Sequence, residues 1–178
     1  MIFTETRLKG ALVIQPELLE DERGFFARTF CRHEFTDHGL QSDFVQCNIS
    51  FNKKYGTLRG MHYQAAPHQE VKLVRCTAGA IYDVIIDLRP DSATFKQWVA
   101  TELSAENRKI LYIPEDFAHG FFTLADNTEV FYQMSEFFVP QAACGLRWND
   151  PAFGIQWPAT VTTISSKDQN YPDFHRNG

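Results

Sequence analysis

Short segments in which apolar and polar residues alternate recur along the chain, and this period of two is typical of β-strands. Residues 44–50 (FVQCNIS) place Val, Cys and Ile on one face of a strand and Gln, Asn and Ser on the other. Residues 80–88 are strongly apolar and β-branched, which is typical of a central strand. We predict strands at 11–15, 25–30, 44–50, 57–64, 71–77, 80–88, 95–103, 109–113, 120–124 and 129–138, and a two-turn helix at 32–38.

Many short strands with scarcely any helix predict an all-β sandwich or barrel. Closed and double-sheet arrangements leave the fewest exposed strand edges, so a jelly roll with a few short helices is the favoured architecture. No internal repeat, low-complexity segment or linker interrupts the pattern. We therefore expect residues 1–178 to form a single domain, long enough to bury a hydrophobic core.

Composition and charge narrow the classes of function. A formal net charge of -5 argues against a nucleic-acid-binding protein, which normally carries a basic surface. The four cysteines have no CxxC spacing, so we expect the reduced thiols of a cytoplasmic protein. The first residues lack the pattern of a secretory signal, and no apolar run reaches the length of a membrane span. We expect a cytoplasmic protein without a membrane or nucleic-acid partner.

Two of the six histidines, His62 and His119, are flanked by apolar residues and glycine, in GMHYQ and FAHGF. Each is either a hydrogen-bonded core residue or a member of a shared site. A metal-dependent jelly roll would use an H-x-H pair, a Glu and a later His. Here Gln64 stands two residues after His62, with Glu70 as the carboxylate, and glutamine is a poor replacement for imidazole. We predict no metal, although a metal-dependent enzyme stays an alternative.

Without a metal, His62 is free to act as a general base, since the unperturbed pKa of histidine is close to neutrality. Lys72 would place a positive charge near it that could stabilise an oxyanion. Tyr132, on the aromatic segment 129–138, could exchange a proton from another direction or simply pack in the core. These residue types together are compatible with general acid–base chemistry in which an oxyanion is stabilised.

Nine motifs occur in an order and at a spacing that resemble the dTDP-4-dehydrorhamnose 3,5-epimerase family. They are DERGFF (21–26), QCNIS (46–50), GTLRGMHYQ (56–64), KLVRC (72–76), DVIIDLR (83–89), IPEDFAHGF (113–121), EVFY (129–132), RWNDP (147–151) and SSKD (165–168). The resemblance implies a cupin-type jelly roll (double-stranded β-helix) without metal or other cofactor, usually a homodimer. It implies an enzyme that inverts C3 and C5, on either side of the ketone, in dTDP-4-keto-6-deoxyglucose to give dTDP-4-keto-L-rhamnose.

The same resemblance implies the catalytic roles. His62 would be the base that removes the proton next to the ketone, and Asp168 in SSKD would orient its ring. Lys72 would face the C4 oxygen and stabilise the enolate. Tyr132 would deliver a proton to the opposite face, as inversion requires, and His119 would be a polar contact to the sugar.

Substrate-binding roles follow for five further residues. Arg59 matches a position that contacts phosphate, and Lys167 matches a position that contacts the nucleotide. Arg23 matches another, expected to reach across the dimer into the neighbouring site. Arginine suits phosphate because its planar fork binds two oxygens at once. Gln46 and Asn48 match polar contacts to the nucleotide.

Three positions depart from the family pattern. Arg28 and Ala143 stand where glutamates on the nucleotide side are found, and Phe138 stands where a tyrosine is common. The nucleobase and the exact sugar are therefore open, as is the choice between a 3,5-epimerase and a C3-only or C5-only enzyme. A metal-dependent cupin enzyme and a non-catalytic sugar-binding jelly roll are the further alternatives. Within GTLRGMHYQAAPHQEVKLVRC, His68 and Glu70 receive no role.

Overall fold

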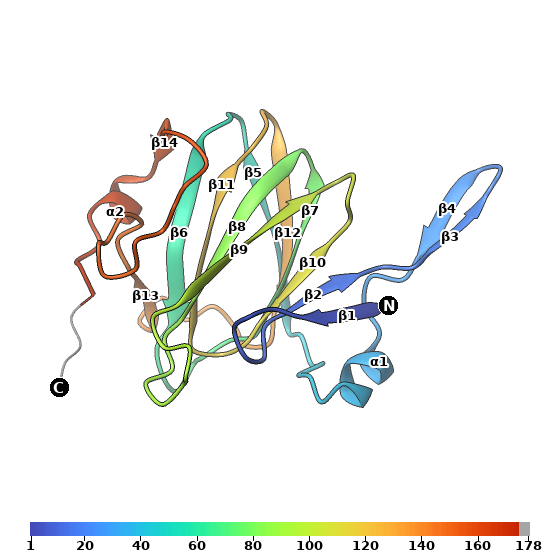
Figure 1. Cartoon of the computed structure of the whole chain (residues 1–178), viewed down its shortest axis with the longest axis horizontal. Coiled ribbons are helices and arrows are strands. Elements are labelled where there is room, and N and C mark those ends of the chain that lie inside the picture. The colour runs from blue at the N-terminus through green and yellow to red at the C-terminus, as the bar shows by residue number, and fades with distance from the viewer. Residues whose placement is uncertain (175–178) are drawn as a thin grey trace.

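The computed structural model of the chain describes residues 1–174 and consists of two packed β-sheets, a separate hairpin and two short helices (Figure 1). The first sheet has the order β1 (Ile2–Glu5), β2 (Leu12–Gln15), β10 (Ile110–Ile113), β7 (Lys72–Ala78), β12 (Thr128–Met134), β5 (Gln46–Asn52). The second has the order β13 (Ala143–Gly145), β6 (Thr57–Gln64), β11 (Phe117–Thr123), β8 (Ala80–Asp87), β9 (Trp98–Ser104), with β14 (Thr163–Ile164) beside β6. The remaining elements are β3 (Leu18–Asp21), β4 (Gly24–Ala27), α1 (Arg32–Asp37) and α2 (Ser166–Gln169).

The strand pairs within the sheets are antiparallel, except that β14 runs parallel to β6. Two packed antiparallel sheets with only two short helices confirm the predicted all-β jelly roll. Within residues 1–174, neither helix is long and apolar enough to cross a membrane.

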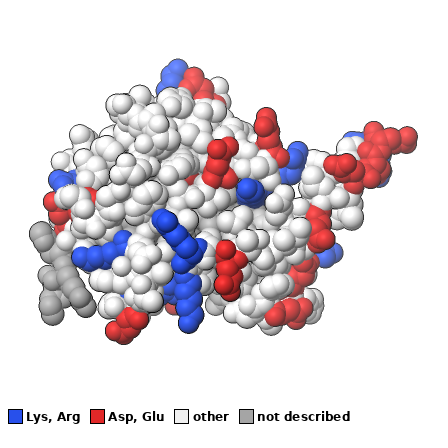
Figure 2. Space-filling model, in the orientation of Figure 1, with Lys and Arg blue, Asp and Glu red and all other residues white. Residues whose placement is uncertain are grey.

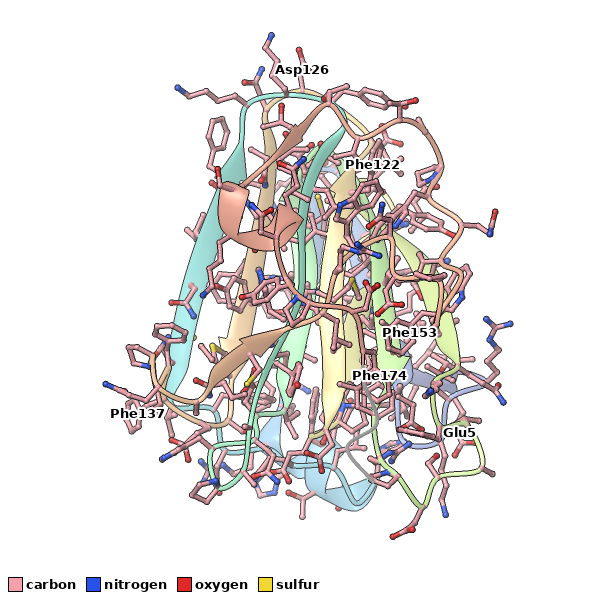
Figure 3. All side chains as sticks on the ribbon, turned by 90° about the vertical axis from the view of Figure 1, so that its left-hand side faces the viewer. Glu5, Phe122, Asp126, Phe137, Phe153 and Phe174 are labelled. Atoms are coloured by element: carbon pink, nitrogen blue, oxygen red, sulfur yellow. The ribbon has the colours of Figure 1, made fainter. Side chains whose placement is uncertain are left out.

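Strand β8 shows why the centre of the second sheet is so apolar. Ile81 and Ile85 point into the cluster between the two sheets, while Val84 and Ile86 point to the opposite face. That outer face is covered by the C-terminal part of the chain, in which Phe153 and Phe174 pack with their ring centroids 5.4 Å apart (Figure 3). A strand buried on both faces needs apolar residues at nearly every position, so the prediction of a central strand is confirmed.

Several predicted elements begin or end elsewhere. The strand expected at 95–103 begins only at Trp98, because Lys96 has a positive φ of 66° that an extended strand cannot contain. The strand expected at 120–124 begins earlier, at Phe117. The prediction of a strand to residue 138 is wrong, since β12 ends at Met134. The helix expected at 32–38 is confirmed as α1.

The strand expected at 25–30 is found, but it is shorter and lies outside the two sheets. Residues 24–27 form β4, which pairs only with β3, and the two project from the body as an arm (Figure 1). We call residues 17–27 the arm. All but Ala27 are exposed, and the acidic residues Glu20, Asp21 and Glu22 gather at its far end (Figure 2). The aromatic residues of this strand are therefore not part of the core of this chain.

Strand β5 at the edge of the first sheet has the alternation that the sequence predicts. The polar side chains of its motif face inward and are half-buried, while the apolar side chains Val45, Ile49 and Phe51 are 46%, 63% and 50% exposed. A polar inner face and an apolar outer face are the reverse of the usual arrangement of a sheet strand. The inner side of β5 therefore borders a polar space within the protein.

Candidate active site

The polar space is a cavity of about 760 Å³ between the two sheets, closed on one side by β13, β14 and α2. Figure 3 looks onto that side, where α2 and β13 lie across the front of the strands and Phe137 projects at the edge. Seven of the ten site residues expected from the sequence line this cavity: Arg59, His62, Lys72, His119, Tyr132, Lys167 and Asp168. They come from both sheets and from α2.

His62 and Asp168 form a hydrogen-bonded pair at the mouth of the cavity. The Nε2 atom of His62 lies 2.7 Å from Oδ1 of Asp168, and the imidazole is 43% exposed whereas the carboxylate is 7% exposed. A carboxylate only accepts hydrogen bonds, so Nε2 carries the proton and donates it. The other nitrogen, Nδ1, is then unprotonated and can accept a proton from a bound molecule.

Asp168 is fixed from three directions. Its backbone amide donates to the Ser165 hydroxyl, which caps α2, and its Oδ2 accepts from the Gly60 amide at 3.3 Å. Burial alone would raise the pKa of Asp168, but the hydrogen bonds from His62, Gly60 and Ser165 outweigh it and hold that pKa below its usual value. Asp168 is therefore an anion that orients the ring of His62.

The strands β6 and β11 approach closely beside this pair. Gly60 has a φ of 130°, and a Cβ atom there would lie 2.5 Å from the Cα of Gly120. Only glycine can occupy this crossing, and the strand register places His119 directly opposite His62. The two histidines thus face the cavity from neighbouring strands.

His119 forms a second histidine–carboxylate pair, with Asp83 of β8. Its Nε2 lies 2.9 Å from Oδ2 of Asp83, whose side chain is fully buried. Burial raises the pKa of Asp83, while the nearby charges of His119 and Lys72 oppose that rise. The prediction for His119 included no partner, and Asp83 received no role. Its signal was an acidic residue at a core-facing position of an otherwise apolar strand.

Lys72 lies at the start of β7 with its ammonium group inside the cavity. Its Nζ is 2.6 Å from Oε1 of Glu70, and the two side chains are only 9% and 3% exposed. The ammonium group of a buried lysine beside a carboxylate can donate its other protons to an oxygen of a ligand. The interpretation of Glu70 as a residue without a role is not supported by this contact.

Tyr132 approaches the cavity from β12, in the opposite sheet to His62. Burial raises the pKa of its phenol, the charge of Arg59 lowers it and the charge of Glu70 raises it further, with a net rise. The hydroxyl is therefore protonated at neutral pH and can donate that proton. Two proton-transfer groups thus face one cavity from two sheets.

Arg59 and Lys167 supply positive charge at the exposed part of the site. The Nε of Arg59 donates to Oδ1 of Asn52 at 2.7 Å and one terminal nitrogen donates to the Phe51 carbonyl at 3.4 Å, which fixes the guanidinium and leaves its remaining donors for a ligand. Lys167 lies over the ring of Tyr171, with Nζ 5.8 Å from the ring centroid. Tyr171 also packs edge-on against His62, with the ring centroids 6.0 Å apart, and was not identified from the sequence.

Three expected site residues lie outside the lining of the cavity. Gln46 and Asn48 are on the inner side of β5, where both amides contact the sulfur of Met134, a lining residue. They are therefore one side chain away from the space. Arg23 is at the tip of the arm, with its side chain 84% exposed and paired with Asp21. It is not part of the cavity of its own chain.

The residues proposed for a metal-dependent alternative have other partners. His62 pairs with Asp168, His119 with Asp83, and the third candidate, Glu70, with a lysine. Within residues 1–174, no three His, Cys, Asp or Glu side chains are grouped so that they could hold a metal ion. The donor set expected for a cupin metal site is thus divided among three separate pairs.

Comparison with known proteins agrees with this geometry. The family described as dTDP-4-dehydrorhamnose 3,5-epimerase matches residues 5–176. The chain belongs to this family. A curated dTDP-4-dehydrorhamnose 3,5-epimerase from Methanothermobacter thermautotrophicus is 43% identical over 178 residues, covering 98% of this chain and 95% of the relative. The resemblance predicted from the nine sequence motifs is therefore confirmed.

Solved structures of the dTDP-4-dehydrorhamnose 3,5-epimerase family have the same fold. The enzyme from Elizabethkingia anophelis superposes with a TM-score of 0.95 at 39% identity, covering 98% of this chain and 96% of that one. The enzyme from Bacillus anthracis, crystallised with TDP and PPi bound, superposes with a TM-score of 0.94 at 41% identity, covering 97% and 99%. The expected cupin-type jelly roll is confirmed by these likenesses.

Proposed function

We propose that this protein is an isomerase that inverts C3 and C5 of dTDP-4-keto-6-deoxyglucose, giving dTDP-4-keto-L-rhamnose. One observation carries the proposal: a histidine–carboxylate pair, a buried lysine and a protonated tyrosine line a single cavity. These are the groups that proton removal next to a ketone requires. Family membership supplies the substrate class.

The first step is removal of a proton from the carbon next to the C4 ketone. Nδ1 of His62 takes the proton, the electron pair moves into a C=C bond, and the C4 oxygen becomes an enolate. Asp168 stabilises the imidazolium that forms. Lys72 donates a hydrogen bond to the enolate oxygen inside a site that largely excludes water, where such a donor contributes about 3 to 4 kcal/mol.

The second step returns a proton to the other face of the same carbon. Tyr132 faces the cavity from the sheet opposite His62 and holds its proton at neutral pH because its pKa is raised. Protonation by Tyr132 gives the inverted centre, and proton exchange between His62, Tyr132 and solvent restores the enzyme. The ketone activates C3 and C5 equally, so one set of groups can serve both carbons.

The nucleotide part of the substrate would extend toward the exposed side of the cavity. Arg59 and Lys167 provide the positive charge for the diphosphate, and TDP bound to the Bacillus anthracis relative supports a nucleotide at this site. Gln46 and Asn48 would contact the nucleotide after movement of the Met134 side chain. Ala143 and Phe138, where the chain departs from the family pattern, also line the cavity.

We also propose that the protein is a cytoplasmic homodimer. The arm exposes Leu19 and Phe26, each 67% accessible, and a two-stranded hairpin alone is marginally stable in water. The edge strand β5 exposes Ile49 and Phe51 on its outer face. Both exposed apolar surfaces would be covered if they packed against a second copy of the chain. In such a dimer, Arg23 would reach the neighbouring site.

The reaction is tested by following deuterium from D₂O into the sugar by NMR. With dTDP-4-keto-6-deoxyglucose we expect label at both C3 and C5, and inversion at both carbons. Label at one carbon alone would restrict the protein to a C3-only or C5-only epimerase. The protein could instead bind dTDP-linked and other nucleotide-linked 4-keto-6-deoxy sugars tightly without exchanging any proton for deuterium. It would then be a sugar-binding jelly roll, and the proposal would be wrong.

A further inference from the structure

Glu70 has an unused hydrogen-bonding atom inside the cavity. Its side chain is 3% exposed and lines the cavity, and its Oε1 contacts Nζ of Lys72 at 2.6 Å. Its Oε2 is buried and has no hydrogen-bond partner among residues 1–174. A buried carboxylate oxygen without a donor is unfavourable, because it has lost water and gained nothing in return.

The backbone fixes Glu70 in this place. Residues two apart on an extended chain point to the same side, so Glu70 and Lys72 both face the cavity. The intervening Val71 donates from its amide to the Ser135 hydroxyl at 2.8 Å and accepts from the Ser135 amide at 3.0 Å. These two hydrogen bonds tie the backbone next to Glu70 to the residue that follows β12.

Neighbouring polar groups cannot satisfy Oε2. Gln64, the nearby amide on the lining of the cavity, already donates to the carbonyl oxygens of His68 and Phe137 and accepts from the Val139 amide. Tyr132 is close enough for the charge of Glu70 to raise its pKa, but it makes no hydrogen bond with Glu70. Oε2 is therefore left without a donor by these two polar groups, and a molecule that fills the cavity could supply one.

We propose that Oε2 of Glu70 accepts a hydrogen bond from the sugar hydroxyl at C3, which makes Glu70 a specificity-determining residue of this site. This rests on the proposed function. Lys72 and Glu70 present a donor and an acceptor side by side, because Oε2 belongs to the carboxylate that contacts Nζ. A ketone with a hydroxyl on the next carbon presents the matching acceptor and donor. In the sugar, C4 and C3 form this pair.

The consequence differs for the two carbons that are inverted. The hydrogen bond from the C3 hydroxyl to Glu70 holds C3 in a defined position relative to His62. C5 carries a methyl group instead, which offers Glu70 no donor. Loss of Glu70 should therefore slow proton exchange at C3 more than at C5, and the effect should vanish for a sugar without the C3 hydroxyl.

The test compares Glu70→Ala, Glu70→Gln and the wild-type protein by NMR rates of deuterium exchange at each carbon. We expect Glu70→Ala to lower exchange at C3 by about 10- to 100-fold, the range for a hydrogen bond to a charged group, and exchange at C5 by about threefold or less. Glu70→Gln keeps one acceptor for two donors and should give an intermediate loss at C3. Glu115→Gln is the matched control, since Glu115 is an exposed acid near Glu70 that is not part of the cavity lining.

Removing the C3 hydroxyl from the substrate tests the same hydrogen bond without any change that could affect folding of the protein. With the 3-deoxy analogue of the same nucleotide sugar, wild type, Glu70→Gln and Glu70→Ala should exchange C5 at equal rates within about twofold. Equal losses at C3 and C5 with the natural sugar, or the same loss with the analogue, would overturn the inference, because Glu70 would then act only through Lys72. If wild-type protein exchanges neither carbon, the proposed function itself is wrong.

Discussion

The two histidine–aspartate pairs consist of the same residue types but lie in different surroundings. His62–Asp168 lies at the mouth of the cavity with a 43% exposed imidazole, and the pKa of its carboxyl group is lowered. His119–Asp83 is sealed, with an 11% exposed imidazole, and the pKa of its carboxyl group is raised. The hydrogen bonds differ by only 0.2 Å, from 2.7 to 2.9 Å, so bond length does not distinguish the pairs.

The number of donors around each carboxylate makes the difference. Asp168 also accepts from the Gly60 amide, and its own amide is fixed by the Ser165 cap. Asp83 has one hydrogen-bonded oxygen, and its Oδ1 has no hydrogen-bond partner within residues 1–174. A well-hydrogen-bonded anion can stabilise a neighbouring imidazolium, while a poorly solvated one tends to stay protonated. The first pair suits proton transfer and the second suits a fixed polar contact.

The largest expected effect comes from removing each imidazole in turn. His62→Ala should lower the rate of deuterium exchange at both carbons by about 10²- to 10⁴-fold, as loss of a general base does. His119→Ala should act mainly on KM, with a loss in kcat/KM of about tenfold, because its contact is a hydrogen bond to the substrate. Steady-state kinetics of the two variants measure this. A larger loss in kcat for His119→Ala would assign the base to the buried pair.

Replacing each carboxylate by its amide should give the next largest effect. Asp168→Asn removes the anion that stabilises the imidazolium, and we expect kcat to fall by about 10²-fold, the lower end of the acid–base range. Asp83→Asn should change kcat by less than about tenfold, since His119 takes no proton. The affinity for dTDP serves as the control, because both substitutions leave Arg59 and Lys167, the proposed phosphate-binding residues, in the chain. Equal losses in kcat would remove the distinction between the pairs.

The sequence predicted most of the body of the fold and less of its periphery. Residues 80–88 and 44–50 specify their strands locally, by an apolar run and by alternation, so both were found. A strand was predicted at 25–30 and one is found at Gly24–Ala27, but the aromatic composition of DERGFFARTF does not reveal that this strand lies outside the two sheets. Helix α2 has four residues in a segment rich in loop signals, too short for a helical period.

The site residues found from the sequence are those that lie in motifs matched to functional positions of the family. The sequence did not assign roles in the site to Asp83 or Glu70. Asp83 matters because of a contact across strands to His119, and Glu70 because of its contact with Lys72 two residues along, and both depend on burial that local sequence does not report. An acid at a core-facing position of β8 was visible in the pattern. The pattern did not show that the alternation of β7 continues two residues before its start, so that Glu70 faces the cavity.

The contributions of Asp168 and Asp83 to the free energy of unfolding should change with pH in opposite directions. The folded pKa of Asp168 is lowered, so its contribution is present above the unfolded pKa of about 3.9 and is lost as pH falls through the folded value. The folded pKa of Asp83 is raised, so its contribution is present below about pH 3.9 and is lost as pH rises through the folded value.

Urea unfolding of wild type, Asp168→Asn and Asp83→Asn between about pH 3 and 7 measures these slopes. We expect the stability advantage of wild type over Asp168→Asn to grow as pH rises, and its advantage over Asp83→Asn to shrink. Asp91→Asn, at an exposed turn, controls for the general change in net charge. Parallel slopes for the two core variants would contradict the assigned surroundings of the carboxylates.

The smallest expected effect concerns the ring that partly covers the exposed pair. Tyr171 packs edge-on against His62, and a Cβ atom on Gly145 would lie 2.2 Å from its ring, so this ring has little freedom to move. An aromatic contact contributes about 0.5 to 1.5 kcal/mol, which corresponds to a change in kcat of about two- to tenfold. Tyr171→Phe should keep kcat, whereas Tyr171→Ala should lower it within that range, and Gly145→Ala should resemble Tyr171→Ala because it displaces the ring. If Tyr171→Phe lost all activity, the Tyr171 hydroxyl would be a proton-transfer group. The His62–Asp168 pair would then depend on a third residue for catalysis.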